Sequence, residues 1–241
     1  MRVVIVTGAS SGIGRATAIR LGRAGFTVVL AARRADLLST VAGEIESAVA
    51  VPTDVRDPEA IKALVARARE VNGRIDGLVN NAGIGGPSSI LTDDDVVTQM
   101  IDVNLVAPIR LMRAVVPIMR EQGSGVIVNI GSVAGEIGIG GTYSATKFAL
   151  RGMNDSVRRE LIGTGVGVTL IEPGFIDTGF NSRKNLPGPE IVAAAVEKAL
   201  RKPRRRMVVP LKYRAAITAS NILPVLTDRL YAGRIGRKAR S

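Results

Sequence analysis

Short apolar runs alternate with longer amphipathic stretches along most of the chain, and this alternation restricts its possible folds more than any other feature. Seven runs rich in Val, Ile, Leu and Ala are expected to be strands: Val3–Val6, Thr27–Ala31, Ala48–Val51, Gly77–Asn80, Val126–Ile130, Val166–Ile171 and Met207–Val209. Six stretches are expected to be helices: Gly12–Ala24, Ala35–Ile45, Pro58–Val71, Asp93–Glu121, Tyr143–Ile162 and Pro189–Arg201. Nearly continuous apolar strands are typical of parallel sheets covered on both faces. We therefore expect a single-domain α/β fold, a doubly wound, mostly parallel seven-stranded sheet with helices on both faces.

The residue types that are missing exclude several kinds of chemistry. The 241 residues include no Cys, no His and no Trp. A zinc site built on Cys and His, a thiolate nucleophile, a Ser–His triad and a disulfide framework are therefore excluded. Proton transfer in such a chain must use carboxylates, Tyr, Lys or water. The acidic triplet Asp93–Asp95 is expected to cap a helix and balance its dipole, and no metal site is expected.

The positive charge of the chain is concentrated near its C-terminal end. Residues 1–197 hold 20 basic and 20 acidic residues, whereas residues 198–241 hold 13 basic residues and one acid, Asp228. The second segment therefore supplies the whole net charge of +12. Because this basic segment has few aromatic residues for base stacking, nucleic acid is not an expected partner. We expect residues 1–210 to form one folded domain and residues 211–241 to form a basic extension.

A glycine-rich turn follows the first expected strand, with the sequence Thr7-Gly8-Ala9-Ser10-Ser11-Gly12-Ile13-Gly14. Glycines between a strand and a helix let the backbone approach a pyrophosphate, and the helix N-terminus offers it unpaired N–H groups. The turn therefore predicts a dinucleotide site in a Rossmann-type sheet. The residues expected to contact the dinucleotide are Gly8, Ser10, Ser11, Gly12, Ile13 and Gly14.

The end of the second expected strand indicates which dinucleotide is bound. An acid at this place would bind the adenosine ribose and favour NAD, but the sequence reads Ala31-Ala32-Arg33-Arg34. A guanidinium can bind the 2′-phosphate of NADP through paired hydrogen bonds. We therefore expect NADP(H), bound by Arg33 and Arg34. The alternative is that both arginines form a solvated helix start.

A tyrosine and a lysine lie one helical turn apart in Tyr143-Ser-Ala-Thr-Lys147. Residues i and i+4 share a helix face, so the ammonium is expected near the phenol. A nearby cation favours phenolate and would lower the pKa of Tyr143 toward neutral pH. In a chain without His, Tyr143 is therefore a candidate acid/base. The alternative is an exposed helical pair.

Together these motifs closely resemble the short-chain dehydrogenase/reductase family in its short, single-domain form, over residues 1–210. Further matches follow in the family's order and spacing: Asp54-Val55, Asn80-Asn81-Ala82-Gly83, Asn104, Ser132, and Pro173-Gly174 through Thr178. Two features depart from the pattern. Ser132 precedes Tyr143 by 11 residues, one or two fewer than is usual, which affects the expected pocket wall at residues 134–142. Ser11 stands where many NADP-preferring members have a basic residue, so Arg33 would carry most of the phosphate recognition.

The resemblance implies a chemical role for four residues. Tyr143 would donate a proton to the substrate carbonyl oxygen in reduction and accept one in oxidation. Lys147 would bind the nicotinamide ribose and hold the pKa of Tyr143 down. Ser132 would hydrogen-bond the substrate oxygen as negative charge develops on it. Asn104, expected in the middle of a long helix, would hold a water that passes protons to Lys147, and the alternative is a solvent-facing Asn.

The resemblance also implies the reaction and the remaining contacts. The expected reaction is hydride transfer between NADP(H) and an apolar ketone, aldehyde or secondary alcohol. The alternatives are a reductase of 3-oxoacyl thioesters on an acyl carrier and, from another class, a catalytically silent NADP-binding regulatory protein. Further cofactor contacts would come from Asp54, Val55, Asn81, Ala82, Gly83, Pro173, Gly174, Ile176 and Thr178. A substrate loop is expected over residues 175–189, with Phe175, Phe180 and Leu186 available for apolar contact.

Two interpretations of the basic extension remain open. Its basic residues, and the apolar ones between Ala215 and Leu230, would suit an anionic membrane surface or an acidic partner. The extension could instead pack over the substrate site or a neighbouring subunit of a homodimer or homotetramer. The longest uncharged stretch, Gly77–Thr92, is too short and polar to span a membrane, and the N-terminus lacks a signal-peptide pattern. We therefore expect a cytoplasmic protein, with peripheral membrane contact as the alternative.

Overall fold

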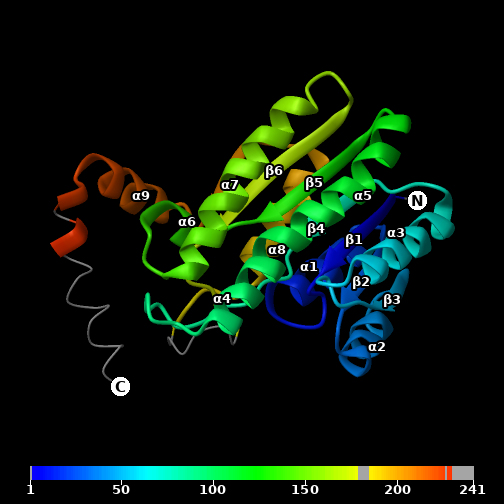
Figure 1. The fold of residues 1–241 in the computed structure, drawn as a ribbon. Helices are drawn as coiled ribbons and strands as arrows, with labels where there is room; N and C mark the ends of the chain where they lie inside the picture. The colour runs from blue at the N-terminus through cyan, green and yellow to red at the C-terminus, as the bar shows by residue number, and fades with distance from the viewer. Residues whose placement is uncertain (1, 179–184, 226, 230–241) are drawn as a thin grey trace.

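A computed structural model describes residues 2–178, 185–225 and 227–229 of the chain. Within them, seven strands form one sheet in the order β3-β2-β1-β4-β5-β6-β7 (Figure 1). All of the neighbouring strand pairs are parallel. The strands are β1 (Arg2–Thr7), β2 (Phe26–Ala32), β3 (Ala48–Pro52), β4 (Gly77–Asn80), β5 (Gly125–Ile130), β6 (Val166–Pro173) and β7 (Arg206–Val209). The expected doubly wound sheet is confirmed, and every strand lies within two residues of its expected bounds.

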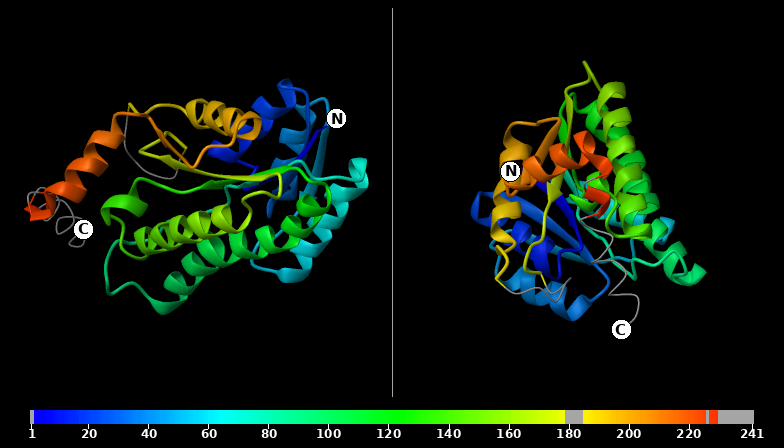
Figure 2. Two further views of the ribbon diagram at one scale, coloured as in Figure 1. Left: turned by 90° about the horizontal axis from the view of Figure 1, so that it is seen from above. Right: turned by 90° about the vertical axis from the view of Figure 1, so that its left-hand side faces the viewer.

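Helices cover both faces of the sheet, as the turned views show (Figure 2). Apolar side chains from both layers meet the buried strands in two clusters, one on each face. One face packs against α1 (Gly12–Arg23), α2 (Ala35–Gly43) and α8 (Glu190–Arg201). The other face packs against α3 (Pro58–Asn72), α5 (Ala107–Glu121) and α7 (Thr142–Glu160). The sheet is thus buried on both sides, which explains why its strands are almost wholly apolar.

The stretch Asp93–Glu121 is not the single regular helix that the sequence predicts. It begins as α4 (Asp94–Ile101), widens into the π-helical segment η1 (Asp102–Val106) and continues as α5. Asp93 is the N-cap residue of α4, but its side chain makes no capping hydrogen bond. Asp94 and Asp95 lie in the first turn, where the helix dipole favours negative charge. Single π-helical turns are frequent at functional sites, and Asn104 lies at the centre of this one.

Two further helices were not predicted from the sequence. The short helix α6 (Ala134–Ile137) follows β5, and α9 (Tyr213–Ile222) follows β7. Helix α9 contacts α6 and β7 at one end of the molecule (Figure 1). It ends before Pro224, as expected for a residue that cannot continue a helix. No helix in the described part of the chain is both long and apolar enough to cross a membrane.

Candidate active site

The expected site residues gather where the strand order reverses between β1 and β4. In doubly wound sheets, ligands bind beyond the carboxyl ends of the strands at such a reversal. The glycine turn follows β1, Asn81 follows β4, and Ser132 follows β5. Tyr143 and Lys147 reach the same end of the sheet from the first turns of α7.

The glycine turn has the geometry of a phosphate cradle. Gly8 and Gly12 have φ values of +66° and +53°, in the left-handed region that other residues rarely adopt. A Cβ on Gly14 would lie 2.1 Å from the carbonyl oxygen of Gly8, so only glycine allows this close packing of turn and helix. Ser11, the N-cap of α1, makes no side-chain capping hydrogen bond. The first N–H groups of α1 therefore lack a cap from Ser11, and the turn fits a pyrophosphate.

The segment after β4 braces this turn. The hydroxyl oxygen of Thr7 accepts hydrogen bonds from the backbone N–H groups of Asn81 and Ala82, both at 3.0 Å. The side-chain amide of Asn81 donates to the carbonyl oxygen of Thr7 at 2.9 Å. A Cβ on Gly83 would lie 3.3 Å from Asn104 Oδ1 and 3.6 Å from Lys147 Nζ. The amide of Asn81 thus holds the glycine turn, while Gly83 lies beside the candidate catalytic residues.

Of the two arginines after β2, Arg34 is the one that contacts the glycine turn. Its Nη2 donates to the hydroxyl oxygens of Ser10 and Ser11, both at 3.1 Å. Arg33 is exposed and adds to the positive field around Asp54. The expectation that Arg33 carries most of the phosphate recognition stays a prediction. The sequence does not say which of the two arginines contacts the turn.

The side chain of Asp54 forms an ion pair with Arg56 in the structure. Its carboxylate accepts hydrogen bonds from the Arg56 guanidinium, with Arg56 Nη2 at 2.6 Å from Oδ2. This bond lowers the pKa of Asp54, with partial opposition from burial. The family resemblance implied a cofactor contact for Asp54, and the sequence did not predict Arg56 as its partner. Val55, the next residue, is buried.

Ser132, Tyr143 and Lys147 converge on one point. Lys147 is buried, and its Nζ donates to the carbonyl oxygen of Ile130 at 2.9 Å. The same Nζ lies 5.7 Å from the ring centroid of Tyr143. Ser132 is hydrogen-bonded to the Tyr143 side chain. A phenol, an ammonium and a hydroxyl therefore lie close together, and the i, i+4 spacing predicts this for Tyr143 and Lys147.

The pKa values of Tyr143 and Lys147 correct one expectation. We expected Lys147 to lower the pKa of Tyr143, but burial raises it, and the hydrogen bond with Ser132 opposes the rise. Burial also lowers the pKa of Lys147 to about 8. Desolvation disfavours the charged form of each group, so the pKa of the phenol rises, the pKa of the ammonium falls, and the two values move apart. The spacing of the two residues does not reveal how deeply they are buried.

Asn104 is fully buried, which excludes the solvent-facing alternative. Its Oδ1 accepts from the N–H of Ile84 at 2.8 Å, and its Nδ2 donates to the carbonyl oxygen of Ile84 at 2.9 Å. Nδ2 also lies 3.2 Å from the Thr146 hydroxyl, one residue before Lys147. Asn104 thus joins the segment after β4 to helix α7. The expected link through a water to Lys147 stays a prediction.

The C-terminal helix contributes a site residue that the sequence analysis missed. A Cβ on Gly174 would lie 2.1 Å from Tyr213 Cε2, because the tyrosine ring packs directly on this glycine. The Tyr213 hydroxyl accepts a hydrogen bond from the N–H of Phe175 at 3.4 Å, and the two rings meet edge to face. Tyr213 therefore covers the end of β6, beside the expected cofactor contacts Pro173, Gly174 and Ile176. The only sequence feature that could have singled out Tyr213 is that it is an aromatic residue within a basic segment.

The expected substrate loop is described only in part. Phe175, Ile176 and Leu186 lie within the described residues, whereas Phe180 lies outside them. Ile176 is buried, and Thr178 packs on the glycine turn, with its Cβ 3.1 Å from the place of a Cβ on Gly12. The start of the loop thus connects the end of β6 to the candidate phosphate cradle.

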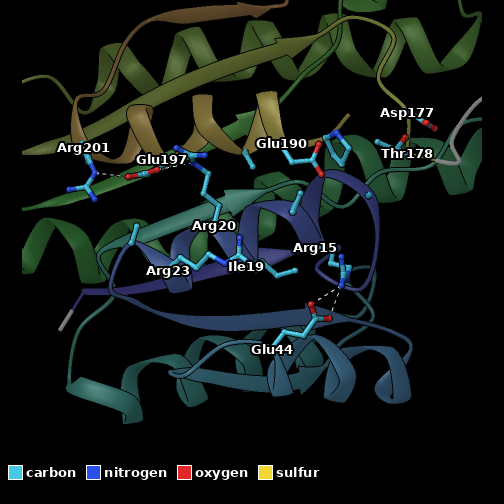
Figure 3. Close-up of a pocket in the computed structure, with 15 residues that line it drawn as sticks. Arg15, Ile19, Arg20, Arg23, Glu44, Asp177, Thr178, Glu190, Glu197 and Arg201 are labelled. Atoms are coloured by element: carbon cyan, nitrogen blue, oxygen red, sulfur yellow. Dashed lines mark hydrogen bonds and ion pairs between the residues drawn. The ribbon is translucent and has the colours of Figure 1, made fainter. Parts of the chain in front are cut away.

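A hollow of about 790 Å³ lies between α1 and α8 (Figure 3), and Ser132, Tyr143 and Lys147 are not among the residues that line it. Of the expected cofactor residues, it is lined by Gly12 and Thr178. Charged side chains that line it form ion pairs, as the dashed lines in Figure 3 show: Arg15 with Glu44, and Glu197 with Arg20 and Arg201. We therefore do not assign the substrate to this hollow.

Comparisons with known proteins identify one family. Residues 2–187 match the family model described as short chain dehydrogenase. The chain is 40% identical to an uncharacterized oxidoreductase of Staphylococcus aureus (strain MRSA252), over 84% of this chain and 92% of that protein. It is 34% identical to ketoacyl reductase HetN of Nostoc sp. (strain PCC 7120), over 95% of this chain and 88% of that protein.

Solved structures have the same fold. A short-chain dehydrogenase of Streptomyces avermitilis superposes with a TM-score of 0.84 at 30% identity, over 98% of this chain and 97% of that one. A 3-ketoacyl-(acyl-carrier-protein) reductase of Brucella melitensis, complexed with NADH, has a TM-score of 0.81 at 26% identity, over 86% and 96%. A short-chain dehydrogenase/reductase of Burkholderia phymatum, in complex with NAD, has a TM-score of 0.88 at 25% identity, over 94% and 95%.

Proposed function

The chain belongs to the short-chain dehydrogenase family, and from this premise we propose that it is an NADP(H)-dependent oxidoreductase acting on apolar carbonyl compounds. The reaction is hydride transfer between nicotinamide and a ketone, an aldehyde or a secondary alcohol. One observation carries the proposal: Ser132, Tyr143 and Lys147 meet at the carboxyl ends of the strands, beside the glycine turn. A bound nicotinamide supplies or accepts the hydride there, and the chain's own residues manage the proton.

Each of the three side chains has a proposed part in moving that proton. Tyr143 donates a proton to the substrate oxygen in reduction and accepts one in oxidation. Because burial raises its pKa, the phenol is held in the protonated form that reduction needs. Ser132 hydrogen-bonds the substrate oxygen as charge develops on it. Lys147 binds the nicotinamide ribose, and Asn104 orders the segment beside Lys147 through its bonds to Ile84.

The proposed cofactor site extends from the glycine turn to the end of β6. The turn shaped by Gly8, Gly12 and Gly14, with the uncapped start of α1, would hold the pyrophosphate. The other proposed contacts are Ser10, Ser11, Ile13, Asp54, Val55, Asn81, Ala82, Gly83, Pro173, Gly174, Ile176 and Thr178. The preference for NADP(H) rests on Arg33 and Arg34 in place of an acid after β2. Arg34 already lies against the turn through Ser10 and Ser11.

The substrate is proposed to be apolar because Phe175, Ile176 and Tyr213 surround the end of β6. A second candidate substrate, a 3-oxoacyl thioester on an acyl carrier, is favoured by the similarity to ketoacyl reductase HetN and to the Brucella reductase. A basic surface would suit an acidic carrier. A silent NADP-binding regulatory protein is the third reading, and the intact Ser132, Tyr143 and Lys147 argue against it.

Two proposals concern partners. A homodimer or homotetramer is proposed as the assembly. The C-terminal region is proposed to contact an anionic membrane surface, because its basic residues accompany exposed apolar ones.

The test measures nicotinamide oxidation with panels of apolar ketones, aldehydes and 3-oxoacyl thioesters. We expect turnover with NADPH and at least roughly 10-fold tighter binding of NADPH than NADH, since a charge-assisted pair contributes about 1.5–3 kcal/mol. The variant Tyr143→Phe keeps the ring and loses the proton, so turnover should fall by at least about 100-fold while NADPH still binds. Equal affinity for NADH would overturn the NADP assignment. Near wild-type turnover in Tyr143→Phe would exclude this tyrosine as the proton donor.

A further inference from the structure

Four charged side chains from four elements meet beside the candidate catalytic residues. They are Glu136 on α6, Arg151 on α7, Glu172 on β6 and Arg206 on β7. Glu136 Oε1 lies 2.8 Å from Arg151 Nη1 and 2.7 Å from Arg206 Nη2. Arg206 Nε also donates to the Glu172 carboxylate. The two carboxylates are almost fully buried, with 4% of Glu136 and 1% of Glu172 exposed.

Burying two carboxylates is costly, so their arrangement needs a compensating pair of cations. The desolvation of each ion costs several kcal/mol and is offset only by well-placed partners. Arg206 bridges both acids, and Arg151 pairs with Glu136 alone. Burial and the neighbouring Glu136 raise the pKa of Glu172, which favours its neutral form, while Arg206 opposes the rise. Loss of Glu136 removes the carboxylate that both arginines share.

The short helix that carries Glu136 also fixes the position of Ser132. The Ser132 hydroxyl oxygen accepts a hydrogen bond from the N–H of Ala134 at 3.1 Å, and its carbonyl oxygen accepts from the N–H of Gly135 at 2.9 Å. Helix α6 also packs closely on α7. A Cβ on Gly135 would lie 2.8 Å from the carbonyl carbon of Lys147. Any movement of α6 would therefore move Ser132 relative to Tyr143 and Lys147.

The ion pairs tie this helix to the framework on two sides. Arg151 lies one turn after Lys147 on α7, so its bond to Glu136 joins α6 to the helix that carries Tyr143. Arg206 joins α6 to β7 and, through Glu172, to the end of β6. The helix has only four residues and could not hold its own position through regular hydrogen bonds.

We propose that Glu136 is a positioning residue, which holds the Ser132 hydroxyl at Tyr143 by tying α6 to Arg151 and Arg206. Its carboxylate is buried against Arg151 and Arg206, so its proposed part is to act through Ser132. The proposal deepens the proposed function, since the Ser132–Tyr143 contact matters for catalysis only if that function holds. The contact itself can be measured without turnover, because the Ser132 hydrogen bond lowers the pKa of Tyr143.

The experiment titrates the Tyr143 phenol by ultraviolet difference spectroscopy in the full-length protein. The chain has three tyrosines, so the Tyr143 signal is isolated by subtracting the spectrum of Tyr143→Phe. In Glu136→Gln the Ser132 bond is weakened, so the pKa of Tyr143 should rise further. With a substrate that wild type turns over, kcat of Glu136→Gln should fall roughly 10- to 100-fold, because small misplacements of reacting groups slow a reaction by such factors. The affinity of Glu136→Gln for NADPH should stay within about 3-fold of the wild-type value.

Matched variants separate positioning from stability. Glu59→Gln removes an exposed acid that pairs with Lys62 on α3, and it should change neither the titration nor kcat. Arg151→Met should reproduce the effect of Glu136→Gln, whereas Arg151→Lys should recover most of the turnover. If Glu136→Gln does not fold, this Arg151 pair decides the question.

An unchanged Tyr143 titration in Glu136→Gln and Arg151→Met, with only a lower melting temperature, would overturn the proposal and leave a purely structural ion cluster. A shifted titration in a protein that turns over no substrate would support the positioning role and reject the proposed function.

Discussion

At the scale of single residues, the burial of Lys147, a candidate catalytic residue, lowers the stability of the folded protein. Lys147 is 5% exposed, and its ammonium donates a hydrogen bond to the carbonyl oxygen of Ile130. Burial lowers its pKa from the ordinary 10.5 to about 8. A shift of this size corresponds to about 3 kcal/mol at pH values where lysine is normally charged. Proteins retain such destabilising groups mainly where function needs them.

The cost of Lys147 predicts an unusual dependence of stability on pH. Between about pH 8 and pH 10.5 the unfolded state binds more protons at this lysine than the folded state does. The free energy of unfolding should therefore rise with pH through this window. Lys147→Met lacks the titrating group and should lose the rise, while Lys62→Met, at an exposed lysine, should keep it. Urea unfolding of the three proteins at pH values across the window measures this difference. Parallel curves for wild type and Lys147→Met would contradict it.

At the scale of elements, the turn from β1 into α1 is the part that the sequence specifies most completely. Glycine occurs where a side chain would collide with the backbone or require a left-handed conformation. Gly14→Ala would place a methyl group 2.1 Å from the carbonyl oxygen of Gly8. Because these are backbone atoms, the turn must open, and we expect dinucleotide binding to be lost.

The matched control for Gly14→Ala is Gly152→Ala, in the interior of α7. No heavy atom lies within 4 Å of the place of its Cβ, so alanine should stabilise the helix by about 0.5–1 kcal/mol and leave binding unchanged. Dinucleotide titration and thermal unfolding of both variants provide the measurement. Full affinity in Gly14→Ala would mean that the turn is looser than its contacts indicate.

The sequence predicted the strands well and the irregular elements poorly, for identifiable reasons. Strand periodicity and apolar runs are local properties, so all seven strands were located. The π-helical turn at Asn104 adds one residue within an apolar pattern that otherwise continues, and nothing local marks it. Helix α6 is too short to have a periodicity. It is held by Glu136, whose partners Arg151 and Arg206 come from distant parts of the chain.

The same distinction holds for the candidate site. Order and spacing gave the residues that converge, namely Ser132, Tyr143 and Lys147. They did not give the direction of the pKa shifts, because these depend on burial, which is a property of the folded structure. Nor did they give Tyr213, whose contact with Gly174 joins segments that are 39 positions apart in the chain.

At the scale of the whole molecule, an electrically balanced body carries a basic C-terminal region. In this region, helix α9 has an inner face that contacts the body, and exposed apolar residues lie beside and beyond it. Its inner face docks on the body through Tyr213 and the buried Ile217, one turn apart. Beside and beyond the helix, Leu211, Ile222 and Val225 are 70%, 69% and 66% exposed. In the described residues, Tyr213 therefore packs over the end of β6, while exposed apolar and basic side chains form an outer surface around α9. Both expected roles of the extension stay predictions.

That outer surface predicts binding to anionic membranes. We expect the full chain to co-sediment with vesicles containing phosphatidylserine, and binding to weaken between low and physiological salt, because exposed charges are screened within about 8–10 Å. A chain that ends at Leu223 keeps Tyr213 but loses Val225 and five of the basic residues. Each basic residue near an anionic surface contributes about 1 kcal/mol, so the shortened chain should sediment far less. Its turnover should be unchanged, because the contacts of Tyr213 with Gly174 and Phe175 are retained.

Vesicles of phosphatidylcholine alone serve as the neutral control. If the full chain stays in the supernatant even at low salt, and its mass in solution falls on truncation, the outer surface faces another copy of this chain and the membrane proposal is wrong.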